Sequence, residues 1–171
     1  MKKAILLSLL FVACAFTASA QKFALIDMEF ILKNIPAYEQ ANTQLSQVSE
    51  KYQKEVEAKA KEAEALYKDY QKVSSSLSAT QKTLKEEGIV AKEKEAAELR
   101  KKYFGPEGEM AKMQQELITP LQDKVYEAVK QVAEQNGYAV IVDRASAESI
   151  IFASPRIDVS NEVLAKLGYS N

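Results

Sequence analysis

The sequence predicts a mainly α-helical protein with a small β body, an α+β fold in which one long antiparallel helical hairpin joins two strand-rich ends. Three observations indicate this fold. A heptad repeat runs through the first half of residues 37–136, a serine cluster interrupts that stretch, and the apolar period becomes that of strands at both ends. The chain of 171 residues contains only 5 glycines and 4 prolines, as expected for a mostly helical protein.

Residues 1–20 have the pattern of a secretory signal peptide. Lys2 and Lys3 precede a short apolar stretch, and an A-x-A cleavage site ends at Ala20. We therefore expect a mature chain that begins at residue 21 and is exported across the inner membrane into the periplasm. In an alternative interpretation, Cys14 becomes a lipidated N-terminus instead of being removed.

The residue types left after this cleavage exclude several kinds of chemistry. The chain has no histidine, and its single cysteine lies in the signal sequence, so catalysis by imidazole or thiolate and most zinc sites are excluded. Removing Lys2 and Lys3 changes the formal net charge from −1 to −3, which is no signature of nucleic-acid binding. We expect neither an enzyme nor a bound cofactor or metal, and no nucleic-acid partner.

The two ends of the mature chain, residues 21–36 and 137–171, are predicted to form the β body. Residues 22–27 (KFALID) and 138–143 (YAVIVD) are apolar runs typical of strands. The run Ile150–Phe152 is expected to add a further strand, joined to the second by a polar turn.

Short helices are expected beside these strands. A helical turn over residues 28–33 precedes Asn34, which is expected to cap the long helix, and Pro36 suits the first turn of that helix. The last helix is expected to begin near Asp158 or Ser160, with Asp158 or Ser160 as its cap, and to stop at Gly168.

The ascending arm of the hairpin carries one heptad seam. Two series of positions seven residues apart interleave at steps of three and four, which places them on one helix face. A helix cannot bury such a stripe against itself, so it must pack on the returning helix, another subunit or a client. The two series are Leu45, Tyr52, Lys59, Leu66 and Val73, and Ser49, Val56, Ala63, Tyr70 and Leu77.

The descending arm is predicted to start after a tip near residues 74–80 and to be kinked near residues 104–108. Proline inside a helix costs about 3 kcal/mol, so Gly105, Pro106 and Gly108 are candidate hinge residues, and alanine at these positions is expected to straighten the arm. Beyond them an apolar stripe returns as far as residue 132, and a cap glycine follows at residue 137.

The β body predicts self-association. So small a body, without metal or disulfide, rarely supplies enough core to be stable alone, and its strands leave edges that need covering. We therefore expect a homo-oligomer that shares this body, although the seam residues fix no copy number. The predicted oligomerisation residues are Phe23, Leu25, Val140, Val142, Ile150 and Phe152.

The arms offer two kinds of contact for a partner. Tyr67 lies off the heptad seam and is a candidate client contact, as are the adaptable side chains of Met110 and Met113, which core packing would also explain. Residues 68–102 carry nine Lys/Arg against six Asp/Glu, which predicts a basic tip that could attract anionic surfaces. The tip lysines considered are Lys82, Lys85, Lys92 and Lys94.

This order of elements resembles the Skp/OmpH family of periplasmic chaperones. The resemblance rests on the signal peptide, the strand KFALID, the long charged hairpin, the strand around residues 140–143 and the closing helix DVSNEVLAKL. It implies a jellyfish-shaped homotrimer in which three subunits share a β-barrel body. It also implies that the helical arms enclose unfolded outer-membrane proteins until these are inserted.

Two classes of function remain open at this point. The first is an ATP-independent periplasmic holdase that prevents aggregation of unfolded outer-membrane proteins through many weak contacts. The second is a coiled-coil scaffold or adaptor of the cell envelope. The mature chain has no tryptophan and no concentrated aromatic cluster along its sequence, which favours distributed contacts and hence the holdase. The basic tips could also touch an anionic membrane surface.

Overall fold

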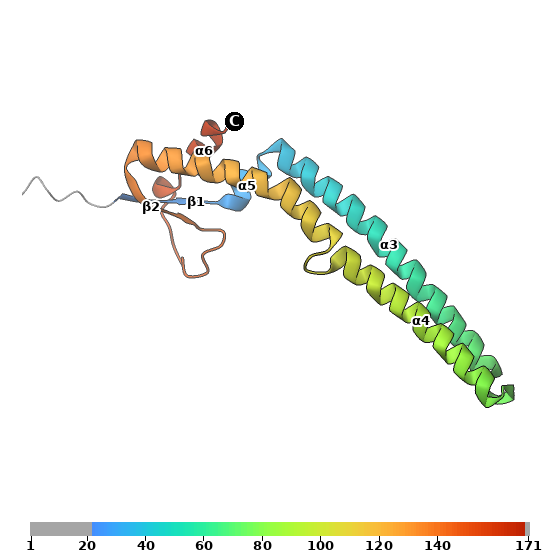
Figure 1. The fold of residues 1–171 in the computed structure, drawn as a ribbon. Coiled ribbons are helices and arrows are strands. Elements are labelled where there is room, and N and C mark those ends of the chain that lie inside the picture. The colour runs from blue at the N-terminus through green and yellow to red at the C-terminus, as the bar shows by residue number, and fades with distance from the viewer. Residues whose placement is uncertain (1–21, 170–171) are drawn as a thin grey trace, which may run out of the picture. The chain divides into compact units, whose positions relative to one another are not determined.

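The computed structural model describes residues 22–169, which divide into two compact units (Figure 1). Residues Ile35–Asp123 form one unit, called here the hairpin unit. Residues 22–34 together with 124–169 form the second, called here the β unit. The predicted signal peptide, residues 1–20, lies outside the described residues together with its cysteine.

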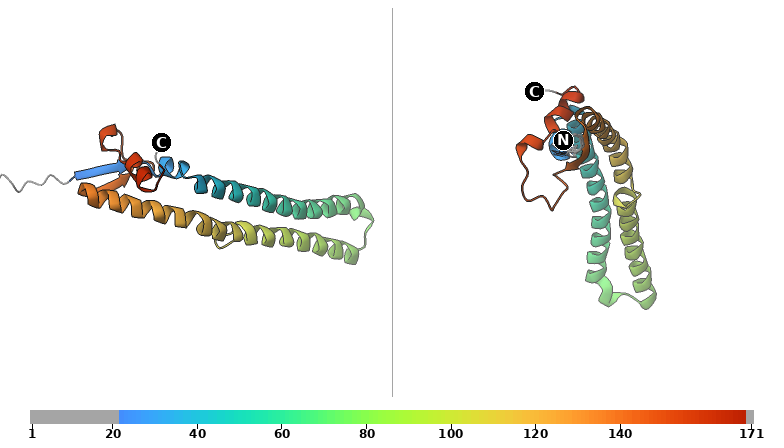
Figure 2. Two further views of the ribbon diagram at one scale, coloured as in Figure 1. Left: turned by 90° about the horizontal axis from the view of Figure 1, so that it is seen from above. Right: turned by 90° about the vertical axis from the view of Figure 1, so that its left-hand side faces the viewer.

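In the hairpin unit, helices α3 (Pro36–Val73) and α4 (Ala79–Phe104) run side by side and antiparallel, joined through the short 3-10 helix η1 (Ser74–Ser76) (Figure 2). A capping box starts α4. The Ser78 hydroxyl accepts a hydrogen bond from the Gln81 amide at 3.3 Å, and the Gln81 side chain accepts one from the Ser78 amide at 3.0 Å. The serine cluster therefore turns the chain, as its composition predicts.

The start of α3 differs from the prediction in one detail. Pro36 does occupy its first turn, but the cap residue is Ile35, whose side chain makes no capping hydrogen bond. Asn34 instead ends the preceding helix α2 (Met28–Lys33), where its Nδ2 donates to the Phe30 carbonyl oxygen at 2.8 Å. The expectation that Asn34 caps the long helix is therefore wrong.

The heptad seam of α3 faces α4. Ala63 on this seam is buried, and so are Ile89 and Ala96 on α4. The small side chains of the two alanines let the helix backbones approach each other closely. Toward the tip the two helices pack less tightly, as the exposure of Leu66 and Val73 on the same seam shows.

The return arm is broken where the glycines and proline predict it. Helix α4 ends at Phe104, and helix α5 (Glu109–Asn136) begins after a loop of four residues, 105–108. Helix α5 then continues through Pro120 and ends before Gly137, whose φ of +70° is the left-handed conformation of a C-terminal cap. The first turns of α5 belong to the hairpin unit and its last turns to the β unit.

The β unit contains a parallel pair of strands, β1 (Lys22–Ile26) and β2 (Tyr138–Asp143). Parallel pairing brings β1 and β2 together although more than a hundred residues separate them in the sequence. Phe23 lies opposite Val140 in the register of this sheet.

The expected strand at Ile150–Phe152 is wrong, since this run has no regular secondary structure. One edge of β1 pairs with β2, and its other edge is taken by Asp158, which forms a bridge with Leu25. Residues 144–149 form a series of turns instead of the tight reversal that a hairpin with β2 needs. The apolar run therefore stays unpaired in the described chain, although the outer edge of β2 is free.

The core of the β unit is made by helices packed beside the sheet. Helix α2 packs on the last helix, α6 (Ser160–Lys166), which follows the 3-10 helix η2 (Pro155–Ile157). The expected cap at Asp158 or Ser160 is wrong, because the cap residue is Val159, whose side chain makes no capping hydrogen bond, and Ser160 is already the first helical residue. The Asp158 carboxylate accepts from the Ser160 amide at 2.9 Å, and Gly168 with φ +85° follows the end of the helix, as predicted. The most completely buried large side chains of this core are Ile31, Val125 and Val163.

Candidate functional site

An aromatic joint lies in the hairpin unit beside the break of the return arm. The rings of Tyr52 on α3 and Tyr103 on α4 are stacked, with centroids 3.8 Å apart and an angle of 3° between their planes. Phe104 packs edge-on against both rings, at 6.5 Å from each. The Tyr52 hydroxyl donates to Glu109 at 2.5 Å, and the Tyr103 hydroxyl donates to Glu55 at 2.5 Å.

The hydroxyl groups of this joint are held in the protonated form. The hydrogen bond to Glu55, together with desolvation and nearby carboxylates, raises the pKa of Tyr103 to about 12. The hydrogen bond to Glu109 likewise raises the pKa of Tyr52 and lowers the pKa of Glu109. Lys102 lies 3.3 Å from the Glu109 carboxylate and 5.4 Å from the Tyr103 ring centroid. Both tyrosine hydroxyls therefore remain hydrogen-bond donors to the two glutamates well above neutral pH.

The stacking of Tyr52 on Tyr103 was not predicted from the sequence, because the prediction did not include the register of one arm of the hairpin against the other. A signal existed on α4, where positions spaced by seven residues include Ile89, Ala96 and Tyr103. All three are buried, so this series is the seam that faces α3. The register of α4 against α3, which places Tyr103 on Tyr52, cannot be obtained from either series alone.

The loop at residues 105–108 is built around its glycines. A Cβ atom at Gly105 would lie 2.4 Å from the Lys101 carbonyl oxygen, and one at Gly108 would lie 2.8 Å from the carbonyl oxygens of Lys102 and Tyr103. Backbone hydrogen bonds hold the loop, including Gly105 N–H to the Lys101 carbonyl at 2.8 Å and Gly108 N–H to the Gly105 carbonyl at 2.9 Å. The expected hinge residues thus form a tightly packed turn.

A shallow groove of about 680 Å³ lies over this turn. Three lysines and three glutamates line it, so their charges balance and favour neither a cation nor an anion. The described residues contain no group of three or more His, Cys, Asp or Glu side chains arranged to hold a metal ion.

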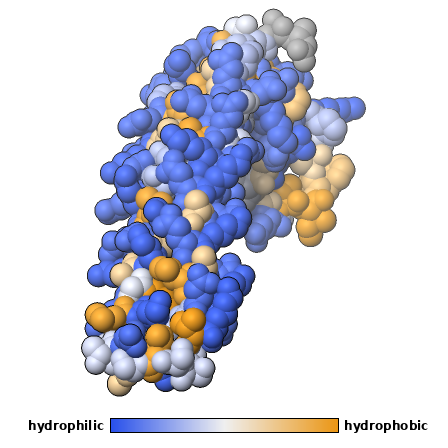
Figure 3. Space-filling model, turned by 90° about the vertical axis from the view of Figure 1, so that its right-hand side faces the viewer, coloured by the Kyte–Doolittle hydropathy of each residue, from blue (hydrophilic) through white to orange (hydrophobic). Residues whose placement is uncertain are grey.

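The candidate client-contact residues differ in exposure. Tyr67 is 48% exposed on α3, whereas Met110 and Met113 at the start of α5 are half-buried. Two residues that the sequence analysis did not consider are more exposed, Leu84 at 63% and Val90 at 60%. Apolar side chains appear among charged ones near the tip of the hairpin, which faces the viewer in Figure 3. The exposure of Leu84 and Val90 could have been predicted from the sequence, because neither residue belongs to the series of positions seven residues apart that forms the α4 seam.

The four tip lysines are not equivalent. Lys85 and Lys94 are exposed, and Lys94 lies 3.8 Å from Glu98 on the same helix. Lys92 instead bonds to Glu95 at 2.7 Å and reaches Glu62 of α3 at 3.8 Å. The hydrogen bond to Glu95 raises the pKa of Lys92. Lys92 therefore contributes to the link between the two helices, while Lys82 is half-buried.

In the β unit, the predicted oligomerisation residues include several large exposed apolar side chains. Phe23 and Val140, neighbours on β1 and β2, are 58% and 54% exposed, and Phe152 is 85% exposed. Leu25 is buried in the subunit itself, and Val142 and Ile150 are partly exposed. The strand pair thus brings Phe23 beside Val140 and Leu25 beside Val142, while Ile150 and Phe152 lie on the irregular segment.

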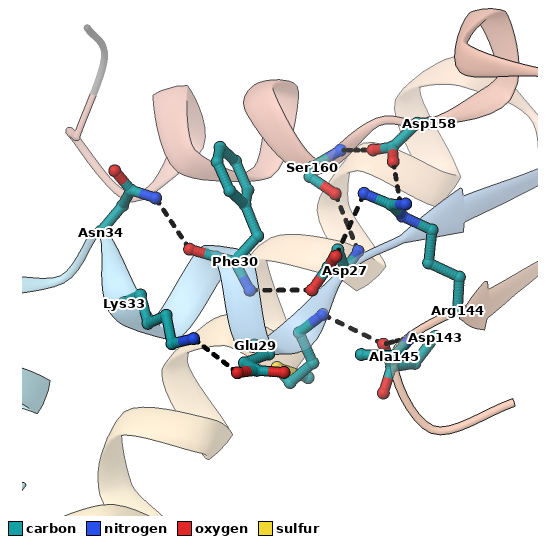
Figure 4. Close-up of polar contacts among 11 residues, drawn as sticks. Asp27, Glu29, Phe30, Lys33, Asn34, Asp143, Arg144, Ala145, Asp158 and Ser160 are labelled. Carbon is teal, nitrogen blue, oxygen red and sulfur yellow. Dashed lines mark hydrogen bonds and ion pairs between the residues drawn. The ribbon is translucent and has the colours of Figure 1, made fainter.

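A polar cluster fixes the carboxyl end of this sheet (Figure 4). Arg144 forms ion pairs with Asp27 at 3.1 Å and with Asp158 at 3.0 Å. The Asp27 amide donates to the Ser160 hydroxyl at 2.8 Å, and the Asp143 carboxylate accepts from the Met28 amide at 3.0 Å. These contacts tie β1, β2, α2 and α6 together.

The charges in this cluster have structural partners. Burial acts to raise the pKa of Asp143, but the hydrogen bonds from Met28, Ser146 and Ala145 together outweigh burial and lower this pKa. Arg144 points to Asp27 and Asp158 and makes no ion pair with Asp143 beside it. The arrangement anchors the elements of the β unit and places no reactive group in a pocket.

No helix among the described residues has both the length and the apolar character needed to span a membrane.

Comparison with known proteins identifies the family. The sequence profile of the family described as outer membrane protein (OmpH-like) matches residues 22–167. The chain is 27% identical over 169 residues to the chaperone protein Skp of Yersinia enterocolitica, covering 98% of this chain and 99% of that protein. It is 29% identical over 174 residues to an uncharacterised protein of Aquifex aeolicus, covering 98% and 96% of the two chains.

The fold agrees with a solved structure. A crystal structure of an OmpH-like protein from Caulobacter crescentus superposes with a TM-score of 0.62 at 13% identity, covering 87% of this chain and 85% of that one. The fold is that of a helical-hairpin protein with a small β body. The chain belongs to the OmpH-like outer membrane protein family.

Proposed function

We propose that this protein is a periplasmic chaperone that binds unfolded outer-membrane proteins and prevents their aggregation without ATP. Family membership and the similarity to Skp of Yersinia enterocolitica support a role in outer membrane protein biogenesis. The holdase mode is supported by one observation above all. Large apolar side chains are exposed at scattered positions along the hairpin, among charged residues, and they include Leu66, Tyr67, Val73, Leu84 and Val90.

Such a surface suits a client without fixed structure. Isolated apolar side chains each offer a weak contact, and an unfolded chain can exchange one contact for another while it remains mobile. A defined adaptor surface would instead concentrate aromatic anchors in a packed patch. In the hairpin unit, the concentrated aromatic group is the joint of Tyr52, Tyr103 and Phe104, whose two tyrosines are engaged within the chain.

We further propose that the functional form is a homotrimer assembled through the β unit. Phe23 and Val140 on neighbouring strands form an exposed apolar pair, and Phe152 is exposed on the irregular segment, so a monomer would leave all three side chains in water. Covering such side chains stabilises an assembly by about 25 cal/mol per Å² of apolar surface removed from water. Three hairpins carried by one assembly would present their weak contacts to the same client, which raises the retention of that client by multivalency.

The distributed character of the contacts can be tested by serine substitution. Leu66, Tyr67, Leu84 and Val90 are replaced singly and together, and retention of a urea-unfolded outer-membrane β-barrel is measured without nucleotide. Each single variant should weaken binding only slightly, while the fourfold variant should lose most of it.

A matched control separates surface chemistry from helix propensity. Serine at the exposed glutamines Gln40, Gln44, Gln47 and Gln71 imposes a similar cost on α3 and should leave binding unchanged. If one single variant abolished binding as fully as the fourfold variant does, the contacts would be a defined docking patch and the protein would be an adaptor.

A further inference from the structure

The return arm approaches α3 in two different ways within the hairpin unit. Along α4 the backbones are close, with Ala63 and Ala96 buried between the helices. At the start of α5 the apolar side chains of Met110 and Met113 are half-buried, and the first buried one is Ile118. The first two turns of α5 therefore bury less apolar surface than the seam of α4 does.

The hydrogen bonds of the aromatic joint are divided between these two helices. Tyr103 of α4 donates to Glu55 of α3, so this bond ties α4 to α3. Tyr52 of α3 donates to Glu109 of α5, so this bond crosses the loop and ties α5 to α3. Within the described chain, Tyr52–Glu109 is the side-chain hydrogen bond that links α3 and α5 directly.

The loop between the helices limits how this link can reform. The close approach of Gly105 and Gly108 to the carbonyl oxygens of residues 101–103 fixes the path of the chain from α4 to α5. The Lys102 ammonium, 3.3 Å from Glu109, holds the same carboxylate from the α4 side. Glu109 thus meets Tyr52 in one position, set by the loop and by Lys102.

We infer that the stacked pair Tyr52 and Tyr103 is a two-part lock of the hairpin arm, in which the Tyr103–Glu55 bond secures the end of α4 and the Tyr52–Glu109 bond separately secures the start of α5. Loss of the second bond loosens the first turns of α5 while α4 stays on α3. The ring stack couples the two halves, because each tyrosine is positioned by the other. This device goes beyond the proposed chaperone function and does not depend on it.

Hydrogen exchange on the full mature chain tests the two halves separately. Tyr52→Phe keeps the ring stack and removes the bond to Glu109, and it should speed exchange of the amides of residues 112–118 about three- to tenfold. Exchange in residues 98–104 should stay at the wild-type rate. Tyr103→Phe should give the reverse pattern, with faster exchange at the end of α4.

A matched control is available nearer the tip. The Tyr70 hydroxyl on α3 donates to Glu86 on α4. This is also a tyrosine–glutamate hydrogen bond between the helices of the hairpin, but it lies far from the loop at residues 105–108. Tyr70→Phe should alter exchange in neither of the two segments. Equal responses of both segments to Tyr52→Phe and to Tyr103→Phe, or an unchanged α5 in Tyr52→Phe, would overturn the two-part lock.

The coupling through the stack needs its own variant. Tyr52→Leu removes both the ring and the bond, so exchange should rise in residues 98–104 and in residues 112–118 together. Circular dichroism first establishes that the variant is folded. A rise confined to one segment would show that the rings do not couple the two halves. Should Tyr52→Leu fail to fold, the pair of phenylalanine variants still decides the assignment.

Discussion

Phe23 and Val140 lie opposite each other on the parallel strands β1 and β2, and both side chains are more than half exposed. Two paired strands are only marginally stable by themselves, so an exposed apolar pair on such a sheet favours a further layer packed over it. The pair therefore marks the surface through which we propose that subunits assemble.

Val140→Asp tests this surface. The side chain is exposed in the single subunit, so an aspartate there should leave the fold of the subunit intact. In an assembly it would bury a charge at a cost of several kcal/mol, so sedimentation should show a folded monomer in place of a trimer. Tyr126→Asp replaces another exposed apolar residue of the β unit and should leave the trimer unchanged. A wild-type protein that is monomeric at micromolar concentration would refute the assembly.

Alanine substitution separates the packed loop from an ordinary helical glycine. Alanine at Gly105 or Gly108 would place Cβ 2.4 or 2.8 Å from backbone oxygens, and we expect each to lower the free energy of unfolding by about 1–3 kcal/mol. Gly88 lies inside α4 with no atom within 4 Å of an added Cβ, so Gly88→Ala should raise stability by up to about 1 kcal/mol. Thermal unfolding of the three variants compares them directly.

This result would also revise the idea of a free hinge. From the sequence, alanine was expected to straighten the arm by extending the helix through the break. A gain in stability and helicity in Gly105→Ala, equal to that in Gly88→Ala, would restore that idea.

The pKa of Tyr103 predicts an alkaline loss of stability. Its pKa is about 12 in the folded chain, against about 10 for an ordinary tyrosine, so its contribution is complete below about pH 10. The contribution is lost as the pH rises from about 10 to about 12. Tyr103→Phe removes this dependence, and the difference in melting temperature between wild type and variant should shrink across that range. A constant difference would contradict the bond to Glu55.

The tip lysines predict salt-dependent association with anionic clients or surfaces. Lys85→Glu and Lys94→Glu reverse two exposed charges and should slow association at low salt, with rates that converge on wild type at high salt. Lys51→Glu and Lys54→Glu apply the same charge change far from the tip and should have a smaller effect. Lys92 is left intact because it pairs across the hairpin with Glu62. Equal rates in all variants at low salt would assign the tip charges to solubility.

The predictable parts of this fold are those that depend on local periodicity. The heptads of α3, the serine turn, the break at 104–108 and the cap glycine at Gly137 follow from neighbouring residues. The failure at Ile150–Phe152 has a different origin. Its strand-like composition needs a tight reversal to pair with the free edge of β2, and residues 144–149 form a series of turns instead.

The aromatic joint was out of reach for a related reason. Tyr52 and Tyr103 each lie on a predictable seam, but their stacking depends on the register between two helices that are joined far away at the tip. The loop at residues 105–108 then sets a new register between α3 and α5, which begins at Glu109. Pairings of this kind appear only when the two arms are placed together.

The central claim is tested most directly by light scattering during dilution of a urea-unfolded outer-membrane β-barrel. The purified mature protein, without ATP, should suppress aggregation at about one trimer per client, and the fourfold serine variant of Leu66, Tyr67, Leu84 and Val90 should not. The glutamine-to-serine control should protect as well as wild type. Aggregation that proceeds at the same rate with and without the wild-type protein would contradict the chaperone function.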